Sequence, residues 1–488
     1  MAASNEVSFV DTTIRDGQMS LWATRMTTNE LLPMAGRLGE SGFAAMEVLG
    51  SAFVKKLVRE LRDDPFERIR RIKELVPTTP LRLIHSRHTA AFQVTPPDVY
   101  RLWTERLRAN GIDEVRMSDP SNTVATWERN KRMAEAAGLR VIVNLVYSSS
   151  PKHTDEYYRK KARAAAALRP PVICIKDPGG LLSPERTRSL VPVVQSEVGD
   201  IPLEFHGHCN NGLGLLNAME AVRLGIRVVN TSIPPLANDA SLPSAVTLAR
   251  NLRALGHAVD IDDDAVSDVS EYIEGIRRVH DLPEGRTAEY DETYYRHQVP
   301  GGMVSNLRFQ LGRLGIGDRL DEVLDEVARV REDLGYPIMV TPYSQFVGTQ
   351  ATLNVTTGPR YSQVLDEIVE YAAGRWGEEE SEGVSAELKD RLLDTERARE
   401  LSAAEDDDVP VSELRRRLDA TDLSDEDFLL RFFTSEADVA VLRSSPNSLL
   451  SATAAQQPWV ALVERLSRAE GIRRVEVSKG NTSLVLAR

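Results

Sequence analysis

The chain has 488 residues and a formal charge of −13, with 42% hydrophobic and 27% charged residues, a composition typical of a soluble globular protein with more than one domain. The acidic balance argues against nucleic acid as a partner, because binding to phosphates needs clustered lysine and arginine. The two cysteines, Cys174 and Cys209, provide neither a disulfide framework nor a cysteine-built zinc site, and the lack of an apolar leader or long apolar run predicts a cytoplasmic protein with no membrane partner.

Short β-rich runs alternate with helical patterns over the first 260 residues. The runs are residues 7–16, 43–50, 81–86, 113–120, 139–148, 172–177, 202–208 and 227–233. They are apolar enough to be buried on both faces, and eight strand–helix units are what a (β/α)8 (TIM) barrel of about 250 residues requires. A doubly wound sheet usually has a glycine-rich phosphate-binding turn after its first strand, and TTIRDGQMS is not one. We therefore predict an α/β fold with a catalytic TIM barrel over residues 1–260.

The remainder of the chain is predicted to be mainly helical. Residues 261–400 contain amphipathic patterns such as RLDEVLDEVARVREDLG, which indicate a helical C-terminal lobe packed over the barrel mouth. Residues 401–488 begin as an acidic helical segment and end in a small hairpin, in which alternating apolar residues flank Gly480-Asn481. We regard this last part as a candidate docking element for a partner protein.

Polar residues follow several of the predicted strands at the end of a barrel where chemistry takes place. They are Asp16, Lys176, His206, His208, Asn230 and Thr231. Two histidines at positions i and i+2 of a strand point to one face, and imidazole binds zinc, manganese or cobalt. Asp16 would add an oxygen ligand at the same rim. The alternative is that His206 and His208 are hydrogen-bonded core residues.

The stretch VICIKDPGG places Lys176 at the end of a buried strand. Burying a lone ammonium is costly. A neutral lysine amine can instead react with CO2 to give a carbamate, an anion that can bind metal and leave an open position for substrate. The alternative is an ion pair of Lys176 with Asp177 or Asp16, and the residues alone leave both hypotheses open.

Longer motifs resemble a known family. VDTTIRDGQMSLWATRM, ICIKDPGGLLSPE, the HGH strand, HQVPGGMVSNL and GYPIMVTPYSQFVGTQATLNVTTGPRY are similar to the carboxyltransferase components of biotin-dependent enzymes. These include the carboxyltransferase domain of pyruvate carboxylase, the alpha subunit of oxaloacetate decarboxylase and the carboxyltransferase subunit of transcarboxylase. The resemblance covers residues 5–435.

The resemblance implies a metal-dependent carboxyltransferase that moves CO2 between carboxybiotin and the enolate of a small acyl or oxo acceptor. Asp16, His206, His208 and a carbamylated Lys176 match the ligands of its divalent metal, and Thr341 matches a threonine that shuttles a proton between biotin and the enol. The chain contains no A-M-K-M biotin-attachment sequence and no ATP-grasp module, so a biotin carrier protein and a biotin carboxylase are expected as separate partners. The family also implies a homodimer.

The predicted acceptor pocket departs from the family pattern. Met19 replaces a glutamine, Lys55 an aspartate and Gln93 a tyrosine, while the pyruvate-binding arginine falls on Ser86, with Arg87 one step away. An arginine fork that holds a carboxylate is hard to replace. We therefore predict an acceptor other than plain pyruvate, unless a one-residue shift restores the contact through Arg87.

Two other functions fit the same residues. The first is a biotin-independent metal-enolate lyase or aldolase on the same scaffold, against which the presence of Lys176 argues. The second is a non-catalytic scaffold subunit of a carboxylase complex, against which the complete set of four candidate metal ligands argues.

Overall fold

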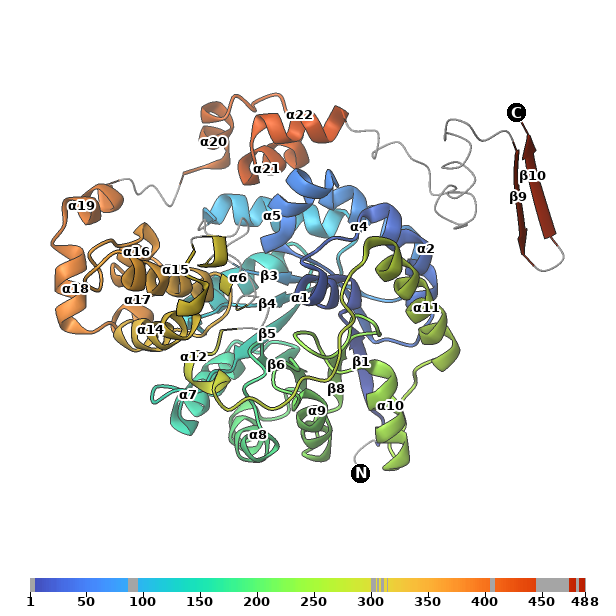
Figure 1. Ribbon diagram of the computed structural model, residues 1–488, viewed down its shortest axis with the longest axis horizontal. Helices are drawn as coiled ribbons and strands as arrows, with labels where there is room; N and C mark the ends of the chain where they lie inside the picture. The colour runs from blue at the N-terminus through green and yellow to red at the C-terminus, as the bar shows by residue number, and fades with distance from the viewer. Residues whose placement is uncertain are drawn as a thin grey trace.

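Eight parallel strands close into a barrel in chain order, as predicted (Figure 1). The computed structural model describes residues 5–86, 95–299, 304, 307–308, 311–313, 315–403, 409–444, 474–479 and 482–487. The strands are β1 (Ser8–Asp11), β2 (Ala45–Gly50), β3 (Leu81–His85), β4 (Glu114–Met117), β5 (Arg140–Val146), β6 (Val172–Asp177), β7 (Leu203–Gly207) and β8 (Val228–Thr231). β1 pairs with both β2 and β8, which closes the barrel.

A helix follows each strand and covers the outside of the barrel. These helices are α2 (Thr28–Gly39), α4 (Pro65–Leu75), α5 (Pro97–Ala109), α6 (Val124–Ala136), α7 (Asp155–Ala167), α8 (Pro184–Val198), α9 (Gly214–Arg223) and α10 (Ala245–Ala254). Local sequence sets several of their starts. Ser183 accepts a hydrogen bond from the backbone of Arg186, and Pro184 occupies the first position of α8, an arrangement that favours helix initiation. A further helix, α11 (Asp263–His280), packs against α2.

The apolar core lies between the strands and this ring of helices, whereas the inside of the barrel is largely polar. Strands β4, β5 and β6 illustrate the alternation, since Val115, Val143 and Ile173 belong to the outer core. The neighbouring positions hold Arg116, Asn144 and Cys174, all of them buried. Side chains of alternate strand residues point to opposite faces, so the polar residues face the barrel axis.

Residues 294–403 form a helical lobe with a core of its own. Its helices are α12 (Tyr294–His297), α14 (Leu320–Asp333), α15 (Tyr343–Thr356), α16 (Asp366–Ala372), α17 (Glu378–Ser381), α18 (Ala386–Leu393) and α19 (Glu396–Ala403). The Tyr343 hydroxyl hydrogen-bonds to Ser121, in the loop after β4. Arg331 donates to the carbonyl of Ser149, in the loop after β5, at 3.0 Å. The lobe therefore lies against the C-terminal ends of β4 and β5 (Figure 1). The domain limits expected from the sequence, at residues 260 and 400, stay a prediction.

The chain then returns to the barrel. Helices α20 (Val411–Arg417), α21 (Asp425–Phe433) and α22 (Glu436–Ser444) lie beside α4 and α5 (Figure 1), and Phe433 belongs to the barrel core. The strands β9 (Arg474–Lys479) and β10 (Thr482–Ala487) pair antiparallel, as predicted for the hairpin. The predicted turn residues Gly480 and Asn481 lie outside the described residues.

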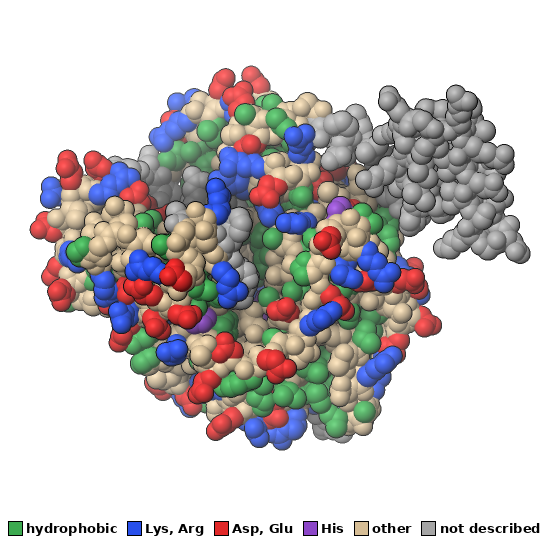
Figure 2. Space-filling model, viewed as in Figure 1, with side chains coloured by type: hydrophobic (Ala, Val, Ile, Leu, Met, Phe, Trp, Pro, Cys, Tyr) green, Lys and Arg blue, Asp and Glu red, His purple; other side chains and the backbone are tan. Residues whose placement is uncertain are grey.

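Two further features concern the charge of the surface and the apolar character of the helices. On the face shown in Figure 2, acidic and basic side chains are interspersed and form no continuous basic stripe. No helix in the described part of the chain combines the length and the apolar character needed to cross a membrane.

Replacing Phe433 with alanine is expected to lower the free energy of unfolding by about 3–5 kcal/mol. The Phe433 ring is 1% exposed and meets Trp103 of α5 edge to face, with ring centroids 5.3 Å apart. Equilibrium denaturation measures the loss. Val441→Ala on the exposed side of α22 is the control, with an expected change within about 0.5 kcal/mol. Equal small effects of both substitutions would contradict the packing of α21 on the barrel.

Candidate metal centre

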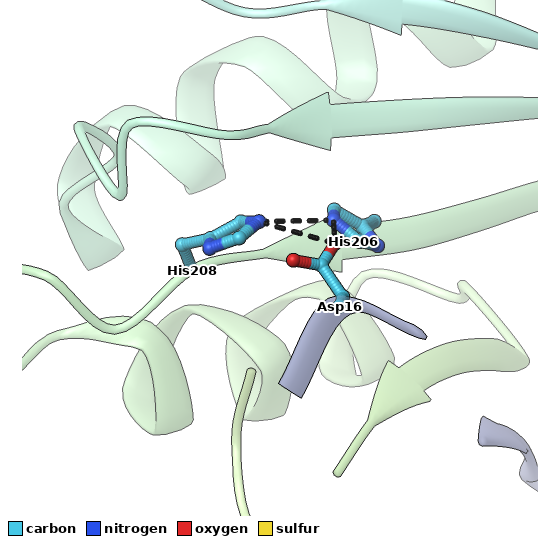
Figure 3. Close-up of side chains that lie close together, drawn as sticks. All are labelled: Asp16, His206 and His208. Atoms are coloured by element: carbon cyan, nitrogen blue, oxygen red, sulfur yellow. Dashed lines mark hydrogen bonds and ion pairs between the residues drawn. The ribbon is translucent and has the colours of Figure 1, made fainter. Parts of the chain in front are cut away.

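Asp16, His206 and His208 meet at the C-terminal end of the barrel (Figure 3). A π-helical turn, Thr13–Gly17, follows β1 and positions Asp16. His206 lies on β7, and His208 directly follows that strand. Asp16 Oδ2 is 3.3 Å from His206 Nε2 and 3.5 Å from His208 Nε2, and the two Nε2 atoms are 3.2 Å apart. The three side chains predicted to share a site therefore converge on one point.

The other ring nitrogens show which atoms carry protons. His208 Nδ1 lies 2.7 Å from the carbonyl oxygen of Ala240, and His206 Nδ1 lies 2.9 Å from Asn230 Oδ1. These oxygens only accept hydrogen bonds, so each Nδ1 carries the proton and each Nε2 presents a lone pair. Two lone pairs and a carboxylate oxygen then face one another with no hydrogen between them. This arrangement fits a cation, and histidines held through Nδ1 are typical of metal ligands.

The charges of Asp16 and His206 support this assignment. Burial alone would raise the pKa of Asp16, but the Arg15 guanidinium holds it well below its usual value. Burial, with Arg116 nearby, lowers the pKa of His206 well below its usual value. Asp16 is therefore a carboxylate and His206 is neutral, which are the states that a metal requires. The mixed nitrogen and oxygen donor set suits zinc, manganese or cobalt.

Lys176 lies beside these ligands. It is paired in register with His206 on the neighbouring strand, and its Nζ donates a hydrogen bond to Ser118 Oγ at 3.2 Å. Burial, assisted by Arg116 and Arg15, lowers its pKa from 10.5 to about 7. About half of the amine is thus neutral near pH 7, and the neutral form is the one that addition of CO2 requires.

The alternative hypothesis of an ion pair for Lys176 is wrong in this structure. Within the described residues no carboxylate lies at ion-pair distance from its Nζ. The Asp177 carboxylate accepts hydrogen bonds from the backbone of Leu181 and Leu182, at 3.0 and 2.8 Å. Asp16 pairs with Arg15 at 2.7 Å.

A buried ion-pair network beneath the centre was not predicted. Arg15 contacts Glu47 of β2, and Glu47 pairs with Arg116 of β4 at 2.8 Å. Burial alone would raise the pKa of Glu47, but Arg116 and Arg15 lower it to about 2. The sequence could have indicated this network. Glu47 in AMEVLG and Arg116 in EVRM are charged residues within apolar strands, as Lys176 is. The two arginines also add to the effect of burial, which is the main cause of the low pKa of Lys176.

The predicted substrate and proton-transfer residues lie around the same end of the barrel or on the lobe. Met19 lies in α1 (Gln18–Trp22) and Lys55 in α3 (Val54–Lys56), and both are half-buried. Ser86 follows β3, and its N–H donates to Ser51 Oγ at 3.2 Å. Thr341 is exposed and precedes α15.

The roles of these residues stay predictions. Within the described residues, no hydrogen bond or ion pair joins Met19, Lys55 or Thr341 to the three converging side chains. Arg87 and Gln93 lie outside the described residues.

Two families match consecutive parts of the chain. Residues 6–273 match the HMGL-like family, and residues 294–440 match the family described as a conserved carboxylase domain. The first match covers the barrel and the first part of α11, and the second covers the lobe and most of α20–α22.

Several characterised proteins are similar over most of the chain. A pyruvate carboxylase subunit of Methanocaldococcus jannaschii is 36% identical, with 80% of this chain and 68% of that protein aligned. The 2-oxoglutarate carboxylase large subunit of Hydrogenobacter thermophilus is 31% identical, with 80% and 60% aligned. The methylmalonyl-CoA carboxyltransferase 5S subunit of Propionibacterium freudenreichii is 29% identical, with 76% and 74% aligned. The chain thus spans roughly two thirds of the length of these relatives.

The fold agrees with a solved structure of the same kind. The carboxyl transferase domain of Rhizobium etli pyruvate carboxylase with pyruvate superimposes with a TM-score of 0.82 at 24% identity, and the match covers 98% of this chain and 83% of that domain. The barrel, the lobe and the sequence similarity to several subunits point to one conclusion. The chain is an enzyme that belongs to the carboxyltransferase family of the biotin-dependent carboxylases.

Proposed function

We propose that the chain transfers a carboxyl group between carboxybiotin on a separate carrier protein and the carbon next to the carbonyl of a 2-oxo acid. The observation that supports this most directly is the convergence of Asp16 Oδ2 and two unprotonated Nε2 atoms, from His206 and His208, within 3.5 Å of one another. A divalent zinc, manganese or cobalt ion held there would polarise the acceptor carbonyl and stabilise the negative charge that develops on its oxygen.

Lys176 is proposed as the fourth ligand, in carbamylated form. Its neutral amine nitrogen adds to CO2, a C–N bond forms, one C–O double bond becomes a single bond, and one proton leaves the nitrogen, so that a buried amine is replaced by a carboxylate-like anion. The register of Lys176 with His206 and the low pKa of its amine support this step. Ser118, whose hydroxyl lies 3.2 Å from Nζ, orients the amine before the reaction.

Carboxyl transfer also requires the movement of one proton. In carboxylation, the acceptor carbon loses a proton and gains the carboxyl group, while N1 of biotin loses the carboxyl group and gains a proton. We assign the proton transfer between the two to the Thr341 hydroxyl, as the resemblance to the carboxyltransferase family implies. Because Thr341 is exposed in the single chain, the bound carrier or a closer approach of the lobe must exclude water around it.

The acceptor class comes from the relatives. The archaeal relative is named for pyruvate and the Hydrogenobacter relative for 2-oxoglutarate. Both acceptors are 2-oxo acids. The prediction of an acceptor other than plain pyruvate gains no support from these proteins, and pyruvate is therefore the first acceptor to test.

The partners follow from the same comparison. Three of the similar proteins are named as subunits, which supports a biotin carrier protein and a biotin carboxylase as separate chains. A homodimer remains a prediction.

The test is decarboxylation of oxaloacetate by purified, metal-analysed protein, with and without free biotin, and with carboxylated 2-oxoglutarate as a second substrate. Biotin-stimulated turnover of one substrate identifies the acceptor. Turnover that is unchanged by biotin would favour the biotin-independent lyase. Bound metal without turnover of either substrate would overturn the acceptor class, and protein that binds no metal would overturn the metal centre.

A further inference from the structure

The two histidines of the metal centre are held in different ways. His208 Nδ1 faces a backbone carbonyl, that of Ala240, which has no hydrogen to donate. His206 Nδ1 instead faces the side-chain amide of Asn230 at 2.9 Å. An amide can present either its oxygen or its NH2 group to the ring. The tautomer of His206 therefore depends on whatever fixes the orientation of Asn230.

Glu204 fixes that orientation. The Asn230 NH2 group lies 2.7 Å from Glu204 Oε1, and Arg82 Nη1 donates to the same oxygen at 2.7 Å. A carboxylate accepts hydrogen bonds and donates none, so the NH2 group must face Glu204 and the amide oxygen must face His206. The four side chains are buried, with exposures of 0–2%, and water is therefore a poor substitute for any of these contacts.

We propose that Glu204 is a positioning residue for metal binding, which acts through Asn230 to keep the proton of His206 on Nδ1. The inference rests on the proposed metal centre. Without an acceptor at position 204, the Asn230 amide can turn over and present its NH2 group to Nδ1. The ring proton then moves to Nε2, where Asp16 Oδ2 accepts it at a distance of 3.3 Å. A protonated Nε2 has no lone pair for a metal ion.

Three variants separate this role from a merely structural one. Glu204→Met removes the acceptor. Glu114→Met is the matched control, because Glu114 is the other carboxylate that pairs with Arg82, at 2.9 Å, and it does not contact Asn230. Glu204→Gln retains one acceptor oxygen for both Arg82 and Asn230.

The first measurement is the affinity for Co2+. The absorption of the bound ion is monitored while a chelator competes for it. We expect Glu204→Met to weaken binding about 10–100-fold, as loss of a partner that orients a ligand does. Glu114→Met and Glu204→Gln should both bind within a few-fold of the wild type. Equal affinities of Glu204→Met and wild type, or an equal loss in Glu114→Met, would overturn the proposal.

The second measurement reads the tautomer directly in metal-free protein, by long-range proton–nitrogen correlation on histidine labelled with 15N. His206 should carry its proton on Nδ1 in the wild type and on Nε2 in a large fraction of Glu204→Met. If Glu204→Met does not fold, Asn230→Ala should show the same shift. An unchanged tautomer would overturn the role of Glu204 even if the wild type binds metal. A wild type that binds no metal would instead overturn the proposed centre.

Discussion

Replacing Lys176 with methionine is expected to lower the rate of biotin-stimulated carboxyl transfer by about 10²–10³-fold or more. Methionine fills a similar volume but cannot add CO2, so the fourth proposed ligand is lost together with its negative charge. Lys161→Met is the matched control, because Lys161 is also buried but lies on α7, where it bonds to the Asn122 carbonyl at 2.8 Å. Comparable activity in Lys176→Met and the control would contradict the role of Lys176.

The pH dependence of carbamylation tests the proposed role of Lys176 independently of mutagenesis. Only the neutral amine adds CO2, and the Lys176 pKa of about 7 makes the neutral fraction fall about tenfold for each pH unit below that value. At a fixed concentration of dissolved CO2, protein stripped of CO2 should therefore regain activity more slowly as the pH falls below about 7, and at a nearly constant rate above about 8. Incubation with 13C-labelled bicarbonate should give a carbamate signal that is absent in Lys176→Met.

Lys176→Met is also expected to raise the free energy of unfolding of the protein free of metal and CO2. Because the pKa of Lys176 is lowered from 10.5 to about 7 on folding, the unfolded chain binds more protons than the folded chain between these values, and wild-type stability rises with pH across that window. Below it, the folded protein bears the full cost of a buried ammonium. Lys176→Met, free of metal and CO2, should thus unfold at a higher temperature than wild type at about pH 6, with a smaller gain near pH 10.

Replacing His208 with alanine is expected to weaken metal binding by more than about 100-fold, beyond the loss found when only an orienting partner is removed. It should also abolish biotin-stimulated turnover. The Nε2 lone pair of His208 is one of three that converge, and its loss leaves Asp16 and His206 without a third fixed donor. Metal content after dialysis and steady-state turnover measure the two effects.

His280→Ala is the control for this substitution. The His280 side chain is 49% exposed and pairs with Glu30 at 2.6 Å, on the outside of the barrel. Metal retained at the wild-type level in His208→Ala would show that the convergent histidines are a hydrogen-bonded pair rather than ligands.

The barrel could be predicted because its strands are short apolar runs that are buried on both faces. The first run shows the limit of this reasoning. Its pattern extends over residues 7–16, but β1 ends at Asp11 and the chain turns at Thr13. That turn depends on bonds to distant residues, such as the one from Thr12 Oγ1 to the Thr231 carbonyl at 2.9 Å. Contacts between residues so far apart in sequence leave no local signal.

The convergence of Asp16, His206 and His208 could be predicted for a similar reason, since each is polar and lies at the end of an apolar strand or a few residues after one. The Ala240 carbonyl, which holds His208, could not be predicted, because any residue offers a backbone carbonyl and only the folded loop brings this one to the ring. Glu204 was within reach of the sequence. It stands two positions before His206 in PLEFHGH, and the alternation of a strand places both on one face.

The return of α20–α22 to the barrel changes how the lobe is connected. The segments before and after the lobe, α11 and α20–α22, both pack against the barrel core, while the lobe has a core of its own. The lobe is thus an insertion whose two ends remain fixed when it unfolds. A closed loop has fewer conformations than a free tail, so the contacts of α21 and α22 stabilise the lobe by restricting its unfolded state, with no contribution to its folded core.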